Sequence, residues 1–409
     1  MLDQLFCCII TPLFFVETMA GLSKEPRRPQ MPERVVSQLA ERTPVVHSYV
    51  NTYHRQLILD EMLGSAFAMD RRPVVPGGIP VQAGDGTDGV VFQKSPEAQA
   101  FERWQRGRFS DVERITARLW RTQLASIDLH AIAKSYRDLM NKDALPRSHE
   151  SAHALAREIV DAPGRNYQAL VIAHNQLELP TAVLPAVISS WRKSGSKPLR
   201  AYAPYASHCL EVDLYFAFAM SNGLISSERP SNRVDMDYLY YLPFCNIFVS
   251  GDKLHRRSVP LFLGQDQLFV WAADLKADLA RLLNHFDQLP AAEKARGLFS
   301  LVTQPPAGDE GVCATLWDRV RPGWRTPRAP IRPLTAEQHA DLIGRSNSMR
   351  ELAAQRATAR HIAPGPTDPT HLIIERDIPR QRGSWRMFSA EFEEAEDRRI
   401  AEKKRGQTT

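Results

Sequence analysis

The sequence predicts an α/β domain with predominantly helical extensions on both sides. Two short apolar runs, at 247–249 and 268–271, have the length and composition of buried strands. Segments with helical spacing of apolar residues flank both runs, and strands that alternate with helices are typical of α/β domains. With 409 residues and 43% hydrophobic side chains, the chain can build a sizeable core and two or three domains.

Shifts in composition divide the chain into five parts. Residues 1–34 are expected to be a disordered leader, in which an apolar run is followed by a Pro- and Arg-rich stretch. Residues 35–160 have mainly helical spacing, and residues 161–290 hold the α/β core. A packing segment and linker at 291–333 then leads to a helical, charged tail at 334–409, which we expect to dock a protein partner through its last helix.

Charge and cysteine content narrow the class of protein. The formal net charge of +5 and the pI of about 8.9 permit an RNA partner without requiring one. The five cysteines form no Cys-x-x-Cys pair, so a reduced, cytoplasmic protein without a cysteine-based zinc site is expected. The apolar run in the leader is shorter than the ~20 residues that span a bilayer, so we expect no membrane segment there. Nothing in the composition predicts an oligomeric state.

Functional residue types are densest at 231–255, SNRVDMDYLYYLPFCNIFVSGDKLH. Asp235 is expected in the first turn of a helix, where the helix dipole favours a carboxylate, and Asp237 follows it. Asp252 comes directly after the strand at 247–249, at the end where open α/β sheets place their binding crevices. One helix–strand unit is therefore expected to bring acidic side chains to one region.

This stretch resembles the last part of a PIN-like nuclease domain, in which an acidic residue opens a helix and a later strand ends in Ser/Thr-x-Asp. The matching residues are Asp235 and Ser250-Gly251-Asp252, and the resemblance covers residues 203–286. It implies a three-layer α/β core with a strand and a helix after Asp252.

The resemblance also implies further acidic residues upstream. A middle acid on the preceding helix would be Glu211 or Asp213, although either could instead form a structural ion pair. A first acid at the end of an early strand would be Asp60. The same segment also fits an amphipathic helix with Asp60 facing solvent, in which case the first acidic position is missing.

Converging carboxylates repel one another and would bind Mg²⁺ or Mn²⁺, which prefer oxygen ligands. The resemblance implies Asp235 and Asp252 as the main ligands, supplemented by Asp237 and Asp60. Ser250 would orient a ligand or water. The residues expected to contact the backbone of an RNA substrate are Lys253, His255 and Arg256.

A motif of a different class lies at 149–153, where His149-Glu150-Ser151-Ala152-His153 matches H-E-x-x-H. Histidines four apart share one helix face and can bind Zn²⁺, while the glutamate activates water. Ser148 has the character of an N-cap, which would place the motif in an exposed first turn. A capped surface helix is the alternative interpretation.

The sequence thus predicts a PIN-like, metal-dependent nuclease that hydrolyses RNA. A catalytically inactive PIN-like or helical interaction protein is the first alternative. A zinc metallopeptidase that uses His149, Glu150 and His153 is the second. Convergence of Asp235 and Asp252 with Glu211 or Asp213 is the structural feature that separates these predictions.

Overall fold

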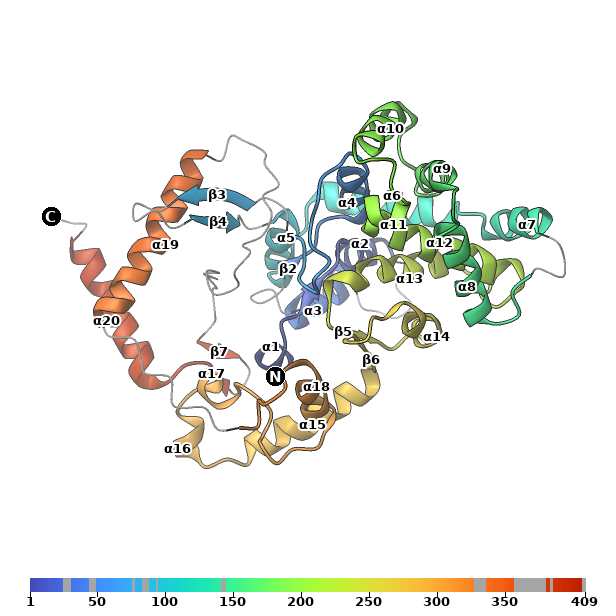
Figure 1. Cartoon of the computed structure of the whole chain (residues 1–409). Helices are drawn as coiled ribbons and strands as arrows, with labels where there is room; N and C mark the ends of the chain where they lie inside the picture. Colours follow the sequence, from blue (N-terminus) through green and yellow to red (C-terminus); the bar gives the residue numbers. More distant parts are fainter. Residues whose placement is uncertain are drawn as a thin grey trace.

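The computed structural model describes residues 1–24, 31–43, 49–75, 78–82, 88–92, 95–140, 145–326, 336–356, 380–382 and 385–406. Helices dominate these ranges (Figure 1). The elements, in chain order, are α1 (Leu2–Leu5), β1 (Ile9–Ile10), α2 (Pro12–Ala20), η1 (Gly21–Ser23), α3 (Pro32–Arg42), β2 (Tyr49–Val50), α4 (His54–Met62), β3 (Gly78–Gln82), β4 (Asp88–Phe92), α5 (Pro96–Gln105), α6 (Asp111–Ala125), α7 (Leu129–Leu139), α8 (His149–Val160), α9 (Asn166–Gln176), η3 (Thr181–Val183), α10 (Leu184–Lys193), α11 (Leu199–Tyr202), α12 (Pro204–Ser221), α13 (Ser231–Asp237), η4 (Tyr238–Phe244), β5 (Ile247–Ser250), α14 (Lys253–Phe262), β6 (Leu268–Trp271), α15 (Ala272–Asp287), α16 (Ala291–Lys294), α17 (Leu298–Leu301), α18 (Val312–Val320), α19 (Ala336–Arg356), β7 (Gln381–Arg382), β8 (Trp385–Arg386) and α20 (Ala390–Gly406).

The predicted α/β fold class is wrong. Strands β5 and β6 form at the predicted places and pair in parallel, with Ile247 opposite Leu268. They pair with no other strand in the described ranges, where every sheet has two strands. The three-layer α/β core is therefore absent from the described part of the chain. Two strands of four residues bury little surface, and the core is built by helices instead.

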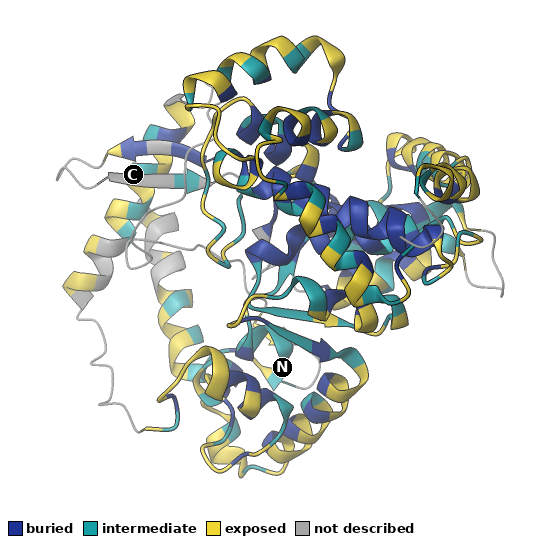
Figure 2. Cartoon of the chain, turned by 45° about the vertical axis from the view of Figure 1, so that its right-hand side comes forward, coloured by how far each residue is buried: buried dark blue, intermediate teal, exposed yellow. Residues whose placement is uncertain are grey.

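Helix α12 is the centre of the main core. Pro204 occupies its first turn, where a missing N–H costs nothing, and Gly223, with a φ of 73°, turns the chain just after its end. Nearly every side chain of α12 is buried, which is the pattern of a helix surrounded by others. Helices α4, α7, α8 and α9 and the 3₁₀ helix η4 pack around it, and Figure 2 shows the buried residues gathered at the centre of the molecule.

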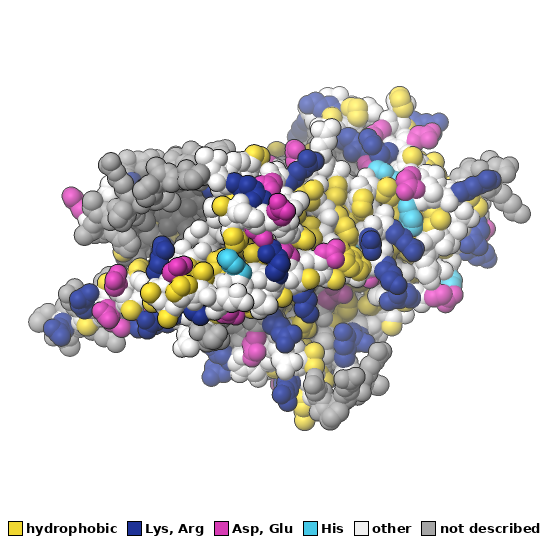
Figure 3. Space-filling model, turned by 90° about the horizontal axis from the view of Figure 1, so that it is seen from below, with side chains coloured by type: hydrophobic (Ala, Val, Ile, Leu, Met, Phe, Trp, Pro, Cys, Tyr) yellow, Lys and Arg dark blue, Asp and Glu magenta, His cyan; other side chains and the backbone are white. Residues whose placement is uncertain are grey.

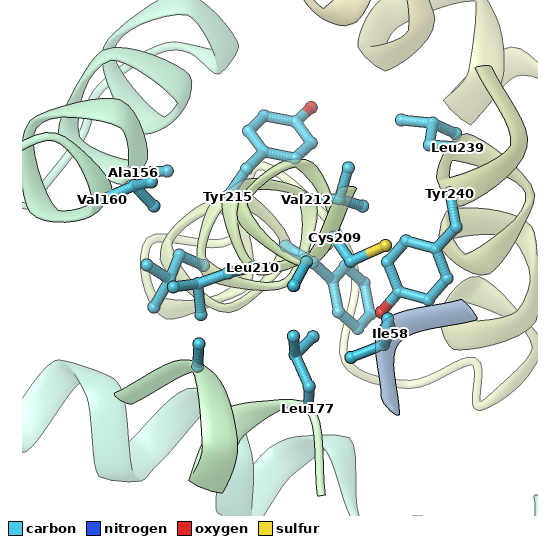
Figure 4. Close-up of a cluster of buried hydrophobic side chains, with 14 of the residues drawn as sticks. Ile58, Ala156, Val160, Leu177, Cys209, Leu210, Val212, Tyr215, Leu239 and Tyr240 are labelled. Carbon is cyan, nitrogen blue, oxygen red and sulfur yellow. The ribbon is translucent and has the colours of Figure 1, made fainter. Parts of the chain in front are cut away.

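Side chains of several elements pack against α12 on different sides (Figure 4). Leu210 lies towards Ala156 and Val160 of α8, whereas Cys209 lies towards Tyr240 of η4. The 18-residue helix thus joins the elements before it in the chain to the segment that carries the acidic stretch.

Residues 1–24, which we expected to lie outside the fold, form α1, β1, α2 and η1 and enter the cores. Leu13 belongs to the main core. Leu5 packs in a second cluster with β6, α15 and α18, and Met19 in a third with α3, α5 and α6. The apolar run of this segment is therefore partly buried against neighbouring elements.

Candidate functional site

Asp235 and Asp252 lie at the junction of α13, β5 and α14. Asp235 is half-buried in α13, which begins at Ser231. It lies in the second turn of that helix, so its predicted place in the first turn is wrong. Asp252 is the N-cap of α14, and its Oδ1 accepts a hydrogen bond from the N–H of Leu254 at 2.6 Å. Asp252 therefore also has a structural role, since it satisfies a backbone donor that the helix leaves unpaired.

His255 connects the backbone of α13 to the end of β5. Its Nε2 lies 2.6 Å from the carbonyl oxygen of Asp235, and its Nδ1 lies 2.8 Å from Oγ of Ser250. A carbonyl only accepts, so Nε2 carries the proton, Nδ1 is the acceptor and the Ser250 hydroxyl donates to it. The N–H of Asp252 in turn donates to Ser250 Oγ at 3.0 Å. These bonds form a continuous link from Asp252 to Asp235.

A third carboxylate, Glu17 of α2, approaches the pair, and its Oε2 accepts a hydrogen bond from the Tyr238 hydroxyl. Burial, together with the charges of Asp252 and Glu17, raises the pKa of Asp235 from 3.8 to about 7. Burial also lowers the pKa of His255, which favours the neutral imidazole in which Nδ1 is the acceptor. We refer to Glu17, Asp235 and Asp252 as the acidic cluster.

Sequence reasoning missed Glu17. The residue was a single acid within an apolar run that we expected to lie outside the fold. The available signal was a carboxylate between apolar residues, because such a group is costly to bury unless it is paired or has a function.

Glu211 does not join the acidic cluster. Its carboxylate lies 2.7 Å from His153 Nε2 and 2.7 Å from a guanidinium nitrogen of Arg200, which also contacts Asp161. Burial would raise the pKa of Glu211, but the hydrogen bonds from His153 and Arg200 outweigh it and lower the pKa. Glu211 thus forms the structural ion pair that was its alternative assignment.

Asp213 and Asp237 are also bound elsewhere, on either side of Arg233. The guanidinium of Arg233 lies 2.8 Å from Asp213 and 2.7 Å from Asp237, and the Tyr240 hydroxyl donates to Asp213. The same guanidinium stacks near the rings of Phe216 and Tyr240. Burial raises the pKa of Asp237 to about 6, against the opposing effect of Arg233. Asp213 is therefore a paired core residue and Asp237 its neighbour.

Asp60 lies in α4, so the strand that would have presented it as a first acid does not form. Its carboxylate accepts a hydrogen bond from Gln56, one turn earlier, at 2.7 Å. The assignment of Asp60 as a solvent-facing helix residue fits this geometry, and its place as a metal ligand does not.

The predicted substrate-binding residues differ in their exposure. Lys253 and Arg256 are exposed on α14, and the Arg256 guanidinium lies 5.3 Å from the centre of the Trp271 ring. His255 is buried and neutral, so it cannot serve as a cation for phosphate. Basic and acidic side chains are interspersed on the face shown in Figure 3, without one continuous basic stripe there.

The H-E-x-x-H segment forms the first turn of α8, with Ser148 as the predicted N-cap. His149 Nδ1 lies 2.7 Å from the Tyr215 hydroxyl, and His153 pairs with Glu211, so both histidines fix α8 to α12. Glu150 is exposed. The two imidazoles thus have protein partners, as a capped structural helix requires.

Metal-binding capacity at the acidic cluster is limited. Within the described ranges, no three His, Cys, Asp or Glu side chains are arranged so that they could hold a metal ion. Asp235 and Asp252 still supply two carboxylates with coupled charges, and Mg²⁺ commonly binds one or two carboxylates together with water and substrate phosphate. The two carboxylates fit an ion whose remaining ligands are water and substrate phosphate. They are too few to bind an ion through protein ligands alone.

No described helix has the length and apolar character needed to cross a membrane. All five cysteines are free thiols. The cytoplasmic location stays a prediction. A protein partner at α20 also stays a prediction, and in this structure α20 contacts the chain through the ion pairs Arg380–Asp397 and Arg386–Glu393.

No family model, curated protein or solved structure matches this chain.

Proposed function

We propose that the protein hydrolyses phosphodiester bonds in RNA at the acidic cluster, with Mg²⁺ or Mn²⁺. The observation that carries the proposal is the hydrogen-bonded link through Ser250 and His255, which holds Asp235 and Asp252 at one junction. Glu211 and Asp213 lie in ion pairs elsewhere, so the convergence that we expected of a PIN-like nuclease does not occur. Neither those two acids nor the three-layer PIN-like core is part of the proposal, which rests on Asp235, Asp252 and Glu17 alone.

Two further features support a bound cation. Burial and the neighbouring charges raise the pKa of Asp235 to about 7, so its ionised form is unfavourable without a cation, and a divalent ion would stabilise that form. All three side chains offer oxygen ligands, which Mg²⁺ and Mn²⁺ prefer.

Each residue then has a distinct role. Asp235 and Asp252 would hold the ion, which when bound polarises a phosphate and lowers the pKa of a bound water. Glu17 adds negative charge beside them, and Tyr238 fixes its orientation. Lys253 and Arg256 extend from the helix that Asp252 caps and would contact the RNA backbone, with an affinity that falls as salt increases.

The test is Mn²⁺-dependent cleavage of a labelled single-stranded RNA by the wild type and by Asp252→Asn. Asparagine is as good an N-cap as aspartate, so α14 is preserved while one charged ligand is lost. We expect a rate loss of roughly a hundredfold or more, because losing even a supporting group behind a metal ligand costs about 10–100-fold. Asp235→Asn should act in the same way.

Asp60→Asn is the matched control, because it makes the same change on the surface of α4, outside the cluster. It should retain the wild-type rate. Equal cleavage by the wild type and Asp252→Asn would remove Asp252 from the site. Absence of cleavage in the wild type at any Mn²⁺ concentration would overturn the proposal and favour the interaction protein.

A further inference from the structure

Helix α6 presents an apolar stripe to solvent on the side opposite its buried face. The buried face, which includes Ala117, packs against α2 and η1. On the outer side, Val112, Ile115 and Leu119 are 72, 47 and 59% exposed. Residues three and four apart are neighbours on a helix, so the three side chains form one continuous stripe. Single exposed apolar residues are ordinary, whereas a stripe of them is typical of a binding surface.

Helix formation does not explain this stripe. A capping box between Ser110 and Glu113 already secures the start of α6. Val112 and Ile115 are β-branched and form helices less readily than alanine, glutamate or lysine would at the same positions. They are also largely in water within one chain, so they gain little from the hydrophobic effect there. A second surface that covers the stripe would supply that gain.

The two flanks of the stripe indicate which kind of surface fits it. Helical spacing places the exposed Asp111 and Arg118 on one flank and the uncharged, exposed Thr116 and Gln123 on the other. A helix that lies on a membrane has a broad apolar face with a strongly basic opposite face, and RNA is bound by cations rather than by aliphatic side chains. A stripe one side chain wide, with charges beside it, is the pattern along which two helices pair.

The stripe is complementary to itself when two copies of α6 meet antiparallel. With Ile115 facing Ile115 of the second copy, Val112 of each copy lies opposite Leu119 of the other, because these residues stand three before and four after the centre. A two-fold axis perpendicular to the helices keeps both charged flanks on the same side of the pair. Asp111, four residues before the centre, then lies beside Arg118 of the second copy.

Both charged side chains are accessible for this contact. The guanidinium of Arg118 has no ion-pair partner among the residues that the structure describes. Asp111 is 95% exposed, and its one described ion pair joins it to Arg114 of the same helix at 3.2 Å. Surface pairs of this kind contribute little, so Asp111 can accept a second cation at a small cost.

We propose that the protein forms a two-fold symmetric dimer through α6, with an apolar seam centred on Ile115 and an Asp111–Arg118 ion pair on each side of the centre. A two-fold dimer is the commonest assembly of identical chains, and it requires a self-complementary surface of this kind. The interface is small, so the dimer exchanges with the monomer at micromolar concentrations. The acidic cluster takes no part in the inference, which does not depend on the proposed function.

Ile115→Glu tests the apolar seam. It places two like charges face to face on the two-fold axis, and we expect it to weaken the dimer about a hundredfold or more. Ile115 is half exposed in one chain, so the substitution is compatible with the fold. Leu139→Glu is the matched control, because it introduces the same charge at an apolar residue that is 81% exposed in α7. It should leave the dimer unchanged.

Asp111→Arg and Arg118→Asp test the charged flank. Each change alone brings like charges together at both symmetric contacts and should weaken the dimer about five- to tenfold. The double variant exchanges the two charges, so both pairs form again and most of the wild-type affinity should return. This recovery is specific to a second copy, because any other partner would keep its own charges.

Sedimentation-velocity ultracentrifugation of the full chain, from about 1 to about 100 μM, measures the dimer over the range expected of a small interface. Melting temperatures at the dilute end, where the chain is monomeric, should match the wild type and show that each variant folds. A wild type that is monomeric throughout would leave the stripe to another kind of partner and overturn the inference. Wild-type dimerisation of Ile115→Glu, or no recovery in the double variant, would overturn it as well.

Discussion

At the scale of single residues, the chain buries several acidic side chains in ion pairs. Arg233 is the best example, since its guanidinium lies between Asp213 and Asp237 and beside two aromatic rings. A buried carboxylate is costly by itself, so the stability of this part of the core depends on keeping the set complete.

Arg233→Met should therefore destabilise the protein by about 3–5 kcal/mol, because it leaves Asp213 buried without its cation. Urea unfolding followed by circular dichroism measures the change. Arg55→Met is the control: the exposed Arg55–Glu178 pair should contribute only about 0–1 kcal/mol. Similar losses in the two variants would show that the Arg233 pair is no more important than a surface pair.

At the scale of elements, the start of α12 is capped from a distant helix. The carboxylate of Glu61, in α4, accepts hydrogen bonds from the N–H groups of Tyr205 and Ala206 at 3.1 and 2.8 Å. Burial nevertheless raises the pKa of Glu61 from 4.5 to about 7, against the lowering effect of those two bonds. The central helix is thus tied to α4 by a carboxyl group whose ionisation is unfavourable in the folded state.

The sign of the pH effect follows from this difference. A carboxyl that binds its proton more tightly in the folded state loses stabilisation as the pH rises from about 4.5 to about 7. Glu61→Gln cannot ionise, so its free energy of unfolding should fall less over this range, by up to ~1.4 kcal/mol per pH unit. Urea unfolding at pH 5, 6, 7 and 8 tests this. Parallel curves for the two proteins would contradict it.

At the scale of the whole molecule, the first twenty residues connect three core clusters. Leu5, Leu13 and Met19 lie in different clusters, and the indole N–H of Trp317 donates to the carbonyl of Leu5 at 3.2 Å. The same segment delivers Glu17 to the acidic cluster. This segment therefore contributes to both the fold and the candidate site.

Leu13→Ala should consequently destabilise the protein by about 2–5 kcal/mol, as removal of a buried leucine side chain does. Leu119→Ala is the matched control, since Leu119 is 59% exposed on α6. Thermal unfolding should show a clear decrease for Leu13→Ala and little change for the control. If residues 1–24 lay outside the fold, the two variants would melt together.

Local features were the part of the structure that could be predicted. Ser148 as a cap and the strands at 247–249 and 268–271 follow from capping preferences and apolar runs. The predicted sheet failed because pairing is not local. Two apolar strands indicate one pair, and whether further strands join them depends on the whole chain.

The amino-acid sequence by itself determined the strands at 247–249 and 268–271, the capped helix after Ser148, and that Asp235 and Asp252 belong to one helix–strand unit. Only the tertiary structure decided the partners of each acid. Arg200 pairs with Glu211, Arg233 pairs with Asp213, and Glu17, from far away in the chain, adds its charge to the surroundings of Asp235. The physical reason is that a charge's effect depends on burial and on neighbours within a few ångströms, and in this protein those neighbours come from distant parts of the chain.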